Sequence, residues 1–202
     1  MAARIEKAVV SGVFSLDGQD FDVDNNVWLV GDDDEVLVID APHDAAPIVG
    51  AIGGRRVTAI VLTHGHNDHI TAAVALREAT GAPIWFNPAD RMLWDVVHPG
   101  TAPDHELTDG SSFDVAGTTL VAASTPGHSP GSTCLLAAGL GTVFTGDTLF
   151  CGGPGATGRS YSDHSTIVES IRARLLTLPG DTVVRTGHGD DTTIDAERSN
   201  VG

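Results

Sequence analysis

The chain has few basic residues. Its 202 residues contain 11 Lys and Arg against 27 Asp and Glu, which gives a formal net charge of -16 at pH 7, and Lys7 is the only lysine. A field of this sign repels phosphate backbones and anionic headgroups. We therefore expect neither nucleic-acid nor membrane binding.

Long apolar runs and a cysteine framework are also missing. No segment approaches the roughly 18 uninterrupted apolar residues of a membrane span, and the start, MAARIEKAVV, lacks the apolar stretch and cleavage site of a secretory signal. The two cysteines, Cys134 and Cys151, form neither a metal-binding pair by spacing nor a disulfide framework. These absences predict a cytoplasmic protein with reduced thiols. They leave the oligomeric state open.

The composition, with 41% hydrophobic and 19% charged residues, is that of an ordinary globular protein. The length fits a single domain, which we take to be residues 1–202. Apolar runs bounded by Gly, Asp and Asn predict strands at 8–15, 26–31, 35–40, 57–63, 83–86, 111–115, 117–123, 132–138, 142–147 and 182–188. Helical spacing predicts helices within 44–52, at 68–81, from near 87, and at 162–178 with Ser162 or Asp163 as N-cap. Two β-then-α halves predict an α+β fold with two sheets face to face and helices outside.

One short segment is unusually rich in histidine. Residues 63–69, THGHNDH, follow a strongly apolar predicted strand and place three of the nine histidines beside an aspartate. By composition alone, the pattern H-x-H-x-D-H would occur in roughly two such chains in a thousand. Chance is therefore a poor explanation, although one motif does not make an active site.

Further candidate ligands follow other predicted strands. His128 lies in TPGHSPGS after the strand 117–123, Asp147 ends TVFTGD, and His188 ends TVVRTGH. Each alone has a plainer interpretation, as a histidine bonded to loop backbone or as a turn residue. Together they favour a metal site, because residues at strand exits converge on one rim of a packed sheet.

The spacing suits two cations. In extended chain, residues i and i+2 point the same way, so His64 and His66 can bind one ion, while Asp68 and His69 enter the following helix and can face elsewhere. Imidazole and carboxylate ligands suit Zn²⁺, with Fe²⁺ or Mn²⁺ as alternatives, and the lack of thiolate partners argues against a closed structural zinc site. Five histidines and two aspartates are too many for one tetrahedral ion. Two divalent ions with one shared carboxylate account for all seven.

These residues, in this order, resemble the metallo-β-lactamase fold superfamily from about residue 8 to residue 190. The resemblance implies a four-layer αββα sandwich with the metals in a cleft at one edge. It also implies a first site of His64, His66 and His128, a second site of Asp68, His69 and His188, and Asp147 as the bridge. Asp68 and Asp147 are on this basis also the predicted catalytic residues.

Within the superfamily, TPGHSPGS and GDTLF are most similar to the glyoxalase II branch, which hydrolyses acyl-thiol thioesters. The segment GRSY at 158–161 resembles the part that contacts glutathione there, which implies Arg159 and Tyr161 as substrate contacts; a surface arginine and a packing tyrosine are the plain alternative. Glyoxalase II has a helical extension that this chain does not show after His188, and its loop before the basic residue is shorter. The thiol carrier stays open between glutathione, another small thiol, coenzyme A and none.

The mechanistic hypothesis is that a hydroxide bridging the two ions attacks the substrate carbonyl, since metal binding lowers the pKa of water from about 15.7 toward ~7. A thioester suits a site without an obvious general acid, because a thiolate leaves readily. Asp40, which ends the strand 35–40, is expected to hydrogen-bond a metal-binding histidine or to serve only as a turn residue.

Three alternatives remain. A persulfide dioxygenase would use a single iron on the positions of His64, His66, His128 and Asp147, or on three of them, and the complete set of Asp68, His69 and His188 argues against it. A metal-binding module without activity would not need a complete ligand set, and a β-lactamase would generally lack the bridging aspartate. The other four histidines are interpreted as surface or capping residues: His43, His98, His105 and His164.

Overall fold

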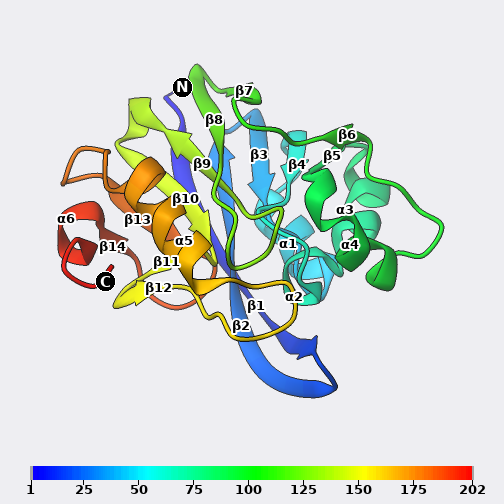
Figure 1. The fold of residues 1–202 in the computed structure, drawn as a ribbon. Helices are drawn as coiled ribbons and strands as arrows, with labels where there is room; N and C mark the ends of the chain where they lie inside the picture. The colour runs from blue at the N-terminus through cyan, green and yellow to red at the C-terminus, as the bar shows by residue number, and fades with distance from the viewer. Residues whose placement is uncertain (1, 202) are drawn as a thin grey trace.

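The computed structural model of the protein describes residues 2–201 and contains two six-stranded sheets packed face to face (Figure 1). The first sheet, in the order β1-β2-β3-β4-β5-β6, comprises β1 (Arg4–Leu16), β2 (Gln19–Gly31), β3 (Glu35–Ile39), β4 (Arg56–Val61), β5 (Ile84–Phe86) and β6 (His105–Glu106). The second, in the order β14-β13-β10-β9-β8-β7, comprises β7 (Ser112–Val115), β8 (Thr118–Ser124), β9 (Thr133–Ala137), β10 (Thr142–Gly146), β13 (Val183–Thr186) and β14 (Thr192–Thr193). A small third sheet pairs β11 (Leu149–Phe150) with β12 (Gly153–Pro154).

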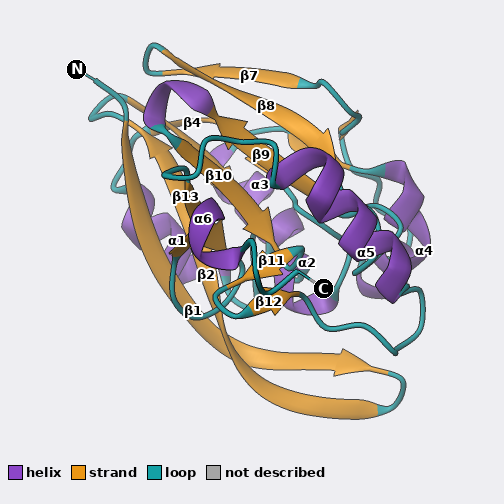
Figure 2. Ribbon diagram, turned by 60° about the vertical axis from the view of Figure 1, so that its left-hand side comes forward, coloured by secondary structure: helices purple, strands orange, loops and turns teal. Residues whose placement is uncertain are grey.

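Helices cover the outer face of each sheet (Figure 2). The first sheet carries α1 (Ala45–Ile52), α2 (Asn67–Ile70), α3 (Ala73–Thr80) and α4 (Arg91–Val97), with a 3-10 turn at Pro88–Asp90. The second carries α5 (His164–Ser170), which continues as a π-helical turn at Ile171–Leu175, and α6 (Ile194–Glu197); a second 3-10 turn covers Ala138–Leu140. Within the described residues, no helix is long and apolar enough to cross a membrane.

Three separate apolar clusters explain the layers. Along β3, Leu37 and Ile39 face the second sheet, where they pack with Phe144, whereas Val36 and Val38 face the helices and pack with Ile48. A third cluster packs α5 against the outer face of the second sheet. Strands that are apolar on both faces are buried on both faces. The expected α+β fold, a four-layer αββα sandwich, is confirmed.

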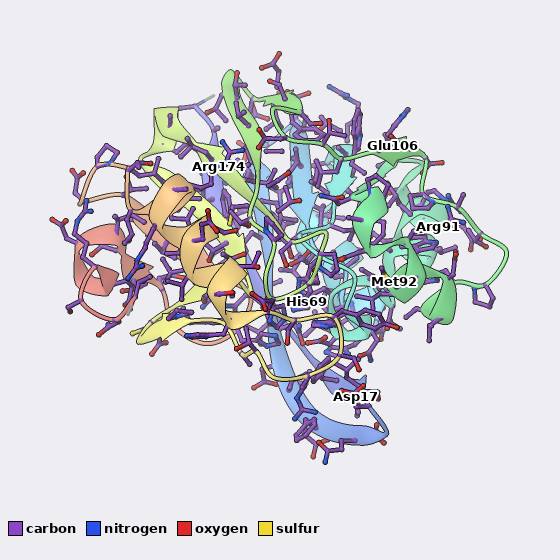
Figure 3. The ribbon with its side chains drawn as sticks, viewed as in Figure 1. Asp17, His69, Arg91, Met92, Glu106 and Arg174 are labelled. Atoms are coloured by element: carbon purple, nitrogen blue, oxygen red, sulfur yellow. The ribbon has the colours of Figure 1, made fainter. Side chains whose placement is uncertain are left out.

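The first two strands are longer than predicted. They form one antiparallel ribbon of 13 residues a side that projects from the body of the protein, with Asp17 at its tip (Figure 3). The two-residue turn, Asp17 and Gly18, has positive φ angles of 53° and 72°, as a tight hairpin requires. Most of residues 19–25 are polar, because the tip of the ribbon has no core to face. For that reason the sequence analysis did not predict them as part of a strand.

Two predicted helices are interrupted or modified. The helix expected at 68–81 is split, because the backbone of Ala41 enters between its halves: Ala41 N donates to His69 O at 2.9 Å and Ala72 N donates to Ala41 O at 2.9 Å. The helix expected at 162–178 begins after Asp163, whose carboxylate accepts from Thr166 N at 2.7 Å, and ends in the π-helical turn. The short β14 and α6 near the C-terminus were not predicted.

Candidate metal centre

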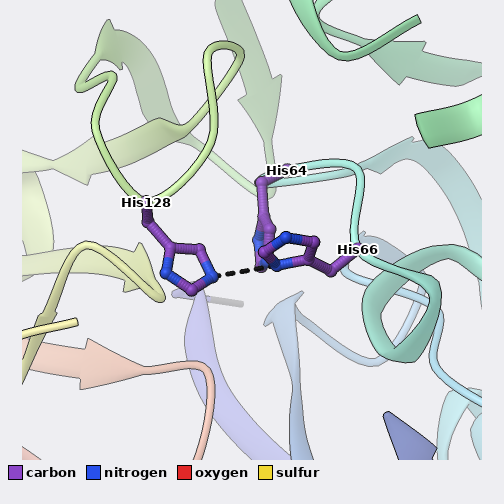
Figure 4. Close-up of side chains that lie close together, drawn as sticks. All are labelled: His64, His66 and His128. Atoms are coloured by element: carbon purple, nitrogen blue, oxygen red, sulfur yellow. Dashed lines mark hydrogen bonds between the residues drawn. The ribbon is translucent and has the colours of Figure 1, made fainter. Parts of the chain in front are cut away.

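The seven residues predicted as metal ligands lie together at one edge of the sandwich. In the first triad, His66 Nδ1 lies 3.0 Å from His64 Nε2 and 2.9 Å from His128 Nε2 (Figure 4). His64 and His66 follow β4, and His128 follows β8, so the two sheets contribute to one triad. None of the three rings is more than 7% exposed.

The second triad lies directly beside the first. Asp68 Oδ2, His69 Nε2 and His188 Nε2 are separated by 3.2 to 3.6 Å, and His69 is also within ring contact of His64. Asp147, after β10, lies between the triads: its Oδ1 is 3.3 Å from His69 Nε2, and its Oδ2 is 3.6 Å from His128 Nε2 and 3.5 Å from His188 Nε2. The structure therefore brings all seven side chains together.

Hydrogen bonds from Nδ1 orient three of the histidine rings so that their Nε2 atoms face the centre of the cluster. Asp40 Oδ2 accepts from His69 Nδ1 at 2.8 Å, and Asp40 itself is held by the backbone N–H and the hydroxyl of Thr63 at 2.8 and 2.9 Å. Backbone carbonyls of Ala156 and Asp24 accept, each at 2.8 Å, from Nδ1 of His128 and of His188. Each bond fixes the tautomer that leaves the Nε2 lone pair facing inward. Asp40 thus lies where the sequence predicted it, against a candidate ligand.

The donor set fits a pair of divalent cations. Asp68 Oδ1 and Asp147 Oδ1 are buried without a hydrogen-bond partner among the described residues, and lone pairs of several imidazoles face one another at about hydrogen-bond distance. Buried acceptors without donors are costly. Cations shared by these nitrogen and carboxylate ligands would satisfy them together.

The two triads differ in their electrostatics. Burial, reinforced by the neighbouring imidazoles, lowers the pKa of His66 to about 3 and that of His64 well below its ordinary value. Burial also acts against charge in the second triad, but the carboxylates of Asp147 and Asp68 outweigh it, so that the pKa of His188 is raised to about 10 and that of His69 well above its ordinary value. Burial likewise opposes the charge of Asp147, yet His69 and His188 hold its pKa well below the ordinary range.

Asp90, which the sequence analysis missed, joins the two loops of the first triad. Its carboxylate is fully buried and accepts from Gly65 N at 2.7 Å, Ser129 Oγ at 2.6 Å and Gly131 N at 2.6 Å. A Cβ atom at Gly131 would lie 2.7 Å from Asp90 Cγ, so only glycine permits this approach. No local pattern distinguishes Asp90 from a helix-capping aspartate.

Asn26 has a similar role for the loop that carries His188. Its side-chain amide donates to the carbonyls of Thr186 and Gly189 at 3.1 and 3.0 Å, and its backbone N–H donates to Gly187 O at 2.8 Å. Two adjacent buried asparagines, Asn25 and Asn26, come directly before the apolar run Val27–Val30 of β2. That conflict between polarity and burial was the available signal for both.

The two predicted substrate contacts lie differently. Tyr161 is 53% exposed and lines, with His66, a cavity of ≈320 Å³ between the tip of the β1–β2 ribbon and α4. The guanidinium of Arg159 instead lies 4.6 Å over the Phe21 ring and donates to Gln19 Oε1 at 3.0 Å. Arg159 is thus engaged by the ribbon and does not line this cavity. Both roles stay predictions.

Comparison with known proteins identifies the family of the chain. The profile of the Metallo-beta-lactamase superfamily matches residues 21–188. A curated relative from Haemophilus influenzae, Hydroxyacylglutathione hydrolase GloC, is 33% identical over 190 residues, which cover 86% of this chain and 89% of the relative.

Solved structures share the fold over most of the chain. BLEG-1 B3 metallo-beta-lactamase superposes with a TM-score of 0.80 at 28% identity, covering 94% of this chain and 97% of its own. TTHA1623 in a di-iron-bound form gives 0.76 at 29% identity, with coverages of 86% and 92%. ETHE1 from Myxococcus xanthus gives 0.73 at 27% identity, with coverages of 95% and 83%.

The pKa differences predict that acid removes an ion from the second triad first. Without metal, His188 is protonated below about pH 10, so ion binding there must release a proton, and its affinity should fall about tenfold per pH unit for each proton released. His66 stays neutral down to about pH 3, so the first triad should keep its ion through the same range. Ion content at fixed free metal, measured between pH 8 and pH 6, tests this. Loss of both ions at one pH would contradict it.

Removal of Asp90 should destabilise the protein even without metal. Asp90→Ala leaves the buried N–H groups of Gly65 and Gly131 unpaired, at about 1–3 kcal/mol each, so we expect the free energy of unfolding to fall by about 2–6 kcal/mol. Asp90→Asn should lose less, because its amide oxygen still accepts. Asp95→Ala, at an exposed position of the same helix, is the matched control and should change stability by less than about 0.5 kcal/mol. Urea denaturation of the metal-free variants measures the differences, and equal midpoints for D90A and D95A would refute the assigned role.

Proposed function

The chain belongs to the metallo-beta-lactamase superfamily of metal-dependent hydrolases, and within it we propose a glyoxalase II-like thioesterase that hydrolyses a small-molecule acyl-thiol with two divalent ions. The observation that carries this proposal is the position of Asp147 between two complete triads. Its Oδ1 faces His69 of the second triad and its Oδ2 lies between His128 of the first and His188 of the second, so this carboxylate is suited to bind both ions. His64, His66 and His128 would hold the first ion, and Asp68, His69 and His188 the second.

The residues of the chain would hold the ions and keep their ligands in position. Two ions held by these residues would supply a Lewis acid and a water of lowered pKa. Asp68 and Asp147, ionised and buried among histidines, would fix the spacing of the ions. Asp40, through its bond to His69 Nδ1, would keep that ring in the ligating tautomer.

The wall of the cleft favours a thioester over an amide. The cleft at the triads has a volume of ≈390 Å³ and is lined, besides the candidate ligands, by Phe14, Val23, Asp24, Phe150 and Ala156. Among these described residues the only further ionisable group is Asp24, whose carboxylate accepts from Ser11 Oγ at 2.6 Å. No side chain of this wall is placed as a proton donor. A thiolate leaves without one, whereas an amine would need a proton.

A mononuclear-iron persulfide dioxygenase is the second candidate, supported by the likeness to ETHE1 at 27% identity. The second triad argues against it, because three further ligands within 3.6 Å of one another are not required for a single iron. The likeness to a di-iron-bound structure supports two ions and keeps iron, manganese and zinc open as the metal.

Parallel assays on one metal-analysed sample separate the two candidates. Hydrolysis predicts thiol release from S-lactoylglutathione or, if the carrier differs, from acetyl-coenzyme A, with two ions per chain and no oxygen uptake. Oxygen consumption with glutathione persulfide and a single bound iron would favour the dioxygenase. Two bound ions with neither activity would leave the metal-binding module.

Asp147→Ala should abolish most of the hydrolysis and at least one ion. Loss of a residue that hydrogen-bonds a metal ligand lowers metal affinity or activity by about 10–100-fold. Loss of a ligand shared by both ions should therefore lower kcat/KM by at least about 100-fold. Asp114→Ala, which removes an exposed carboxylate on β7, controls for the change in charge. Ion content and thiol release are the measurements. Full turnover with both ions retained in D147A would rule out the shared carboxylate.

A further inference from the structure

Asn25 on β2 lies at the second triad, although no sequence motif includes it. Its side chain is fully buried, and its Nδ2 atom lies 3.1 Å from Asp68 Oδ2, 3.3 Å from His69 Nε2 and 3.4 Å from His188 Nε2. Those three ligand atoms are themselves 3.2 to 3.6 Å apart. The end of the amide and the three ligand atoms therefore form the corners of a nearly regular tetrahedron.

The size of this tetrahedron matches a metal ion. A regular tetrahedron with an edge of about 3.3 Å has its centre about 2.0 Å from each corner, which is the usual length of a bond from Zn²⁺ to nitrogen or oxygen. We propose that Asn25 is a fifth protein ligand of the ion in the second triad, beside Asp68, His69, His188 and the shared Asp147, and is bound through its side-chain oxygen. The proposal rests on the metal centre of the proposed function and not on its substrate.

The orientation of the amide depends on the ion. In the neutral rings, which are the forms that bind a metal, Nδ1 carries the proton and Nε2 the lone pair, because His69 Nδ1 donates to Asp40 and His188 Nδ1 donates to Asp24 O. Without a cation, the amide nitrogen of Asn25 donates to Asp68 Oδ2 at 3.1 Å. A cation takes up the lone pairs and repels N–H. Turning the amide by half a revolution then places its oxygen at the fourth corner, and the two ends of an asparagine amide are nearly the same shape.

His43 can support the amide in either orientation. Its Nε2 lies 2.7 Å from Asn25 Oδ1, where it donates as one tautomer; as the other it would accept from the turned amide nitrogen. Gly12 makes room for the ring, since a Cβ atom there would lie 2.2 Å from His43 Cγ. His43, expected from the sequence to be a surface or capping residue, is thus a positioning residue for Asn25.

The added ligand changes which ion suits the second triad. An amide oxygen with the carboxylates of Asp68 and Asp147 gives this position three oxygen donors beside two imidazoles, whereas the first position offers three imidazoles and the shared carboxylate of Asp147. Oxygen donors and a higher coordination number favour Mn²⁺ or Fe²⁺ more than a site dominated by imidazoles does. We therefore expect the two positions to differ in metal preference.

Metal titration of the purified chain tests the assignment. Co²⁺ and Mn²⁺ are titrated into metal-free wild type, Asn25→Ala, Asn25→Asp and His43→Ala, with Asn200→Ala as a remote, exposed asparagine control. Asn25→Ala should weaken the second ion by at least about 10–100-fold and alter the visible spectrum of the second Co²⁺, with the first ion unchanged. Asn25→Asp should retain the second ion, because a carboxylate oxygen takes the place of the amide oxygen. His43→Ala should lie between wild type and Asn25→Ala.

Three other results would contradict the assignment of Asn25 as a ligand. If Asn25→Ala matches wild type in second-ion affinity and Co²⁺ spectrum, Asn25 is not a ligand, and the proposed function stands. If Asn25→Asp is as weak as Asn25→Ala, the amide packs and does not ligate. If wild type binds fewer than two ions, the two-ion centre and this inference fall together. Circular dichroism of the metal-free variants confirms that they are folded, and Asn25→Asp, which keeps the shape of the side chain, serves should Asn25→Ala unfold.

Discussion

Buried lone pairs that face one another are the constraint on which this structure depends. In the first triad, acceptor nitrogens of neighbouring rings approach within 3.0 Å of each other, and in the second, two carboxylates lie beside two imidazoles. The first triad is unfavourable until a cation enters it, since the desolvation of its rings is not repaid by hydrogen bonds, whereas in the second the carboxylates can hold protons on the imidazoles. The surrounding fold must therefore hold the side chains in place against their own preference.

Two sheets packed through a shared core provide that rigidity. The strands that deliver ligands are β4 in one sheet and β8, β10 and β13 in the other, and Leu37, Ile39 and Phe144 lock the sheets together between them. Because all four strands end at the same edge, their exit loops meet without long connections. Single buried polar side chains then fix the loops: Asp90 joins the loops of His66 and His128, and Asn26 holds the loop of His188.

The ligands could be predicted because their signal is local. His64, His66, Asp68 and His69 stand within six positions, and strand exits in the sequence indicated where His128, Asp147 and His188 would meet them. Asn25 and Asp90 could not, because their partners are remote: the side chain of Asn25 bonds residues 18 to 163 positions away, and that of Asp90 bonds residues 25 to 41 positions away. For the same reason the split of the helix at 68–81 was missed, since its cause is the backbone of Ala41. Asn25 and Asp90 are polar residues of types common in turns, and in this structure they bond the candidate ligands or the loops that carry them.

The asymmetry of the triads bears on how the centre can work. In the first triad His64 and His66, whose pKa values are lowered, bind an ion without releasing a proton near neutral pH, whereas the second triad binds one in competition with protons that Asp68 and Asp147 hold on His69 and His188. The first position is therefore suited to permanent occupancy and the second to exchange. Asp147 couples them, because an ion on either side draws on the same carboxylate. A reaction that needs both ions would then respond to pH and metal supply through the second position alone.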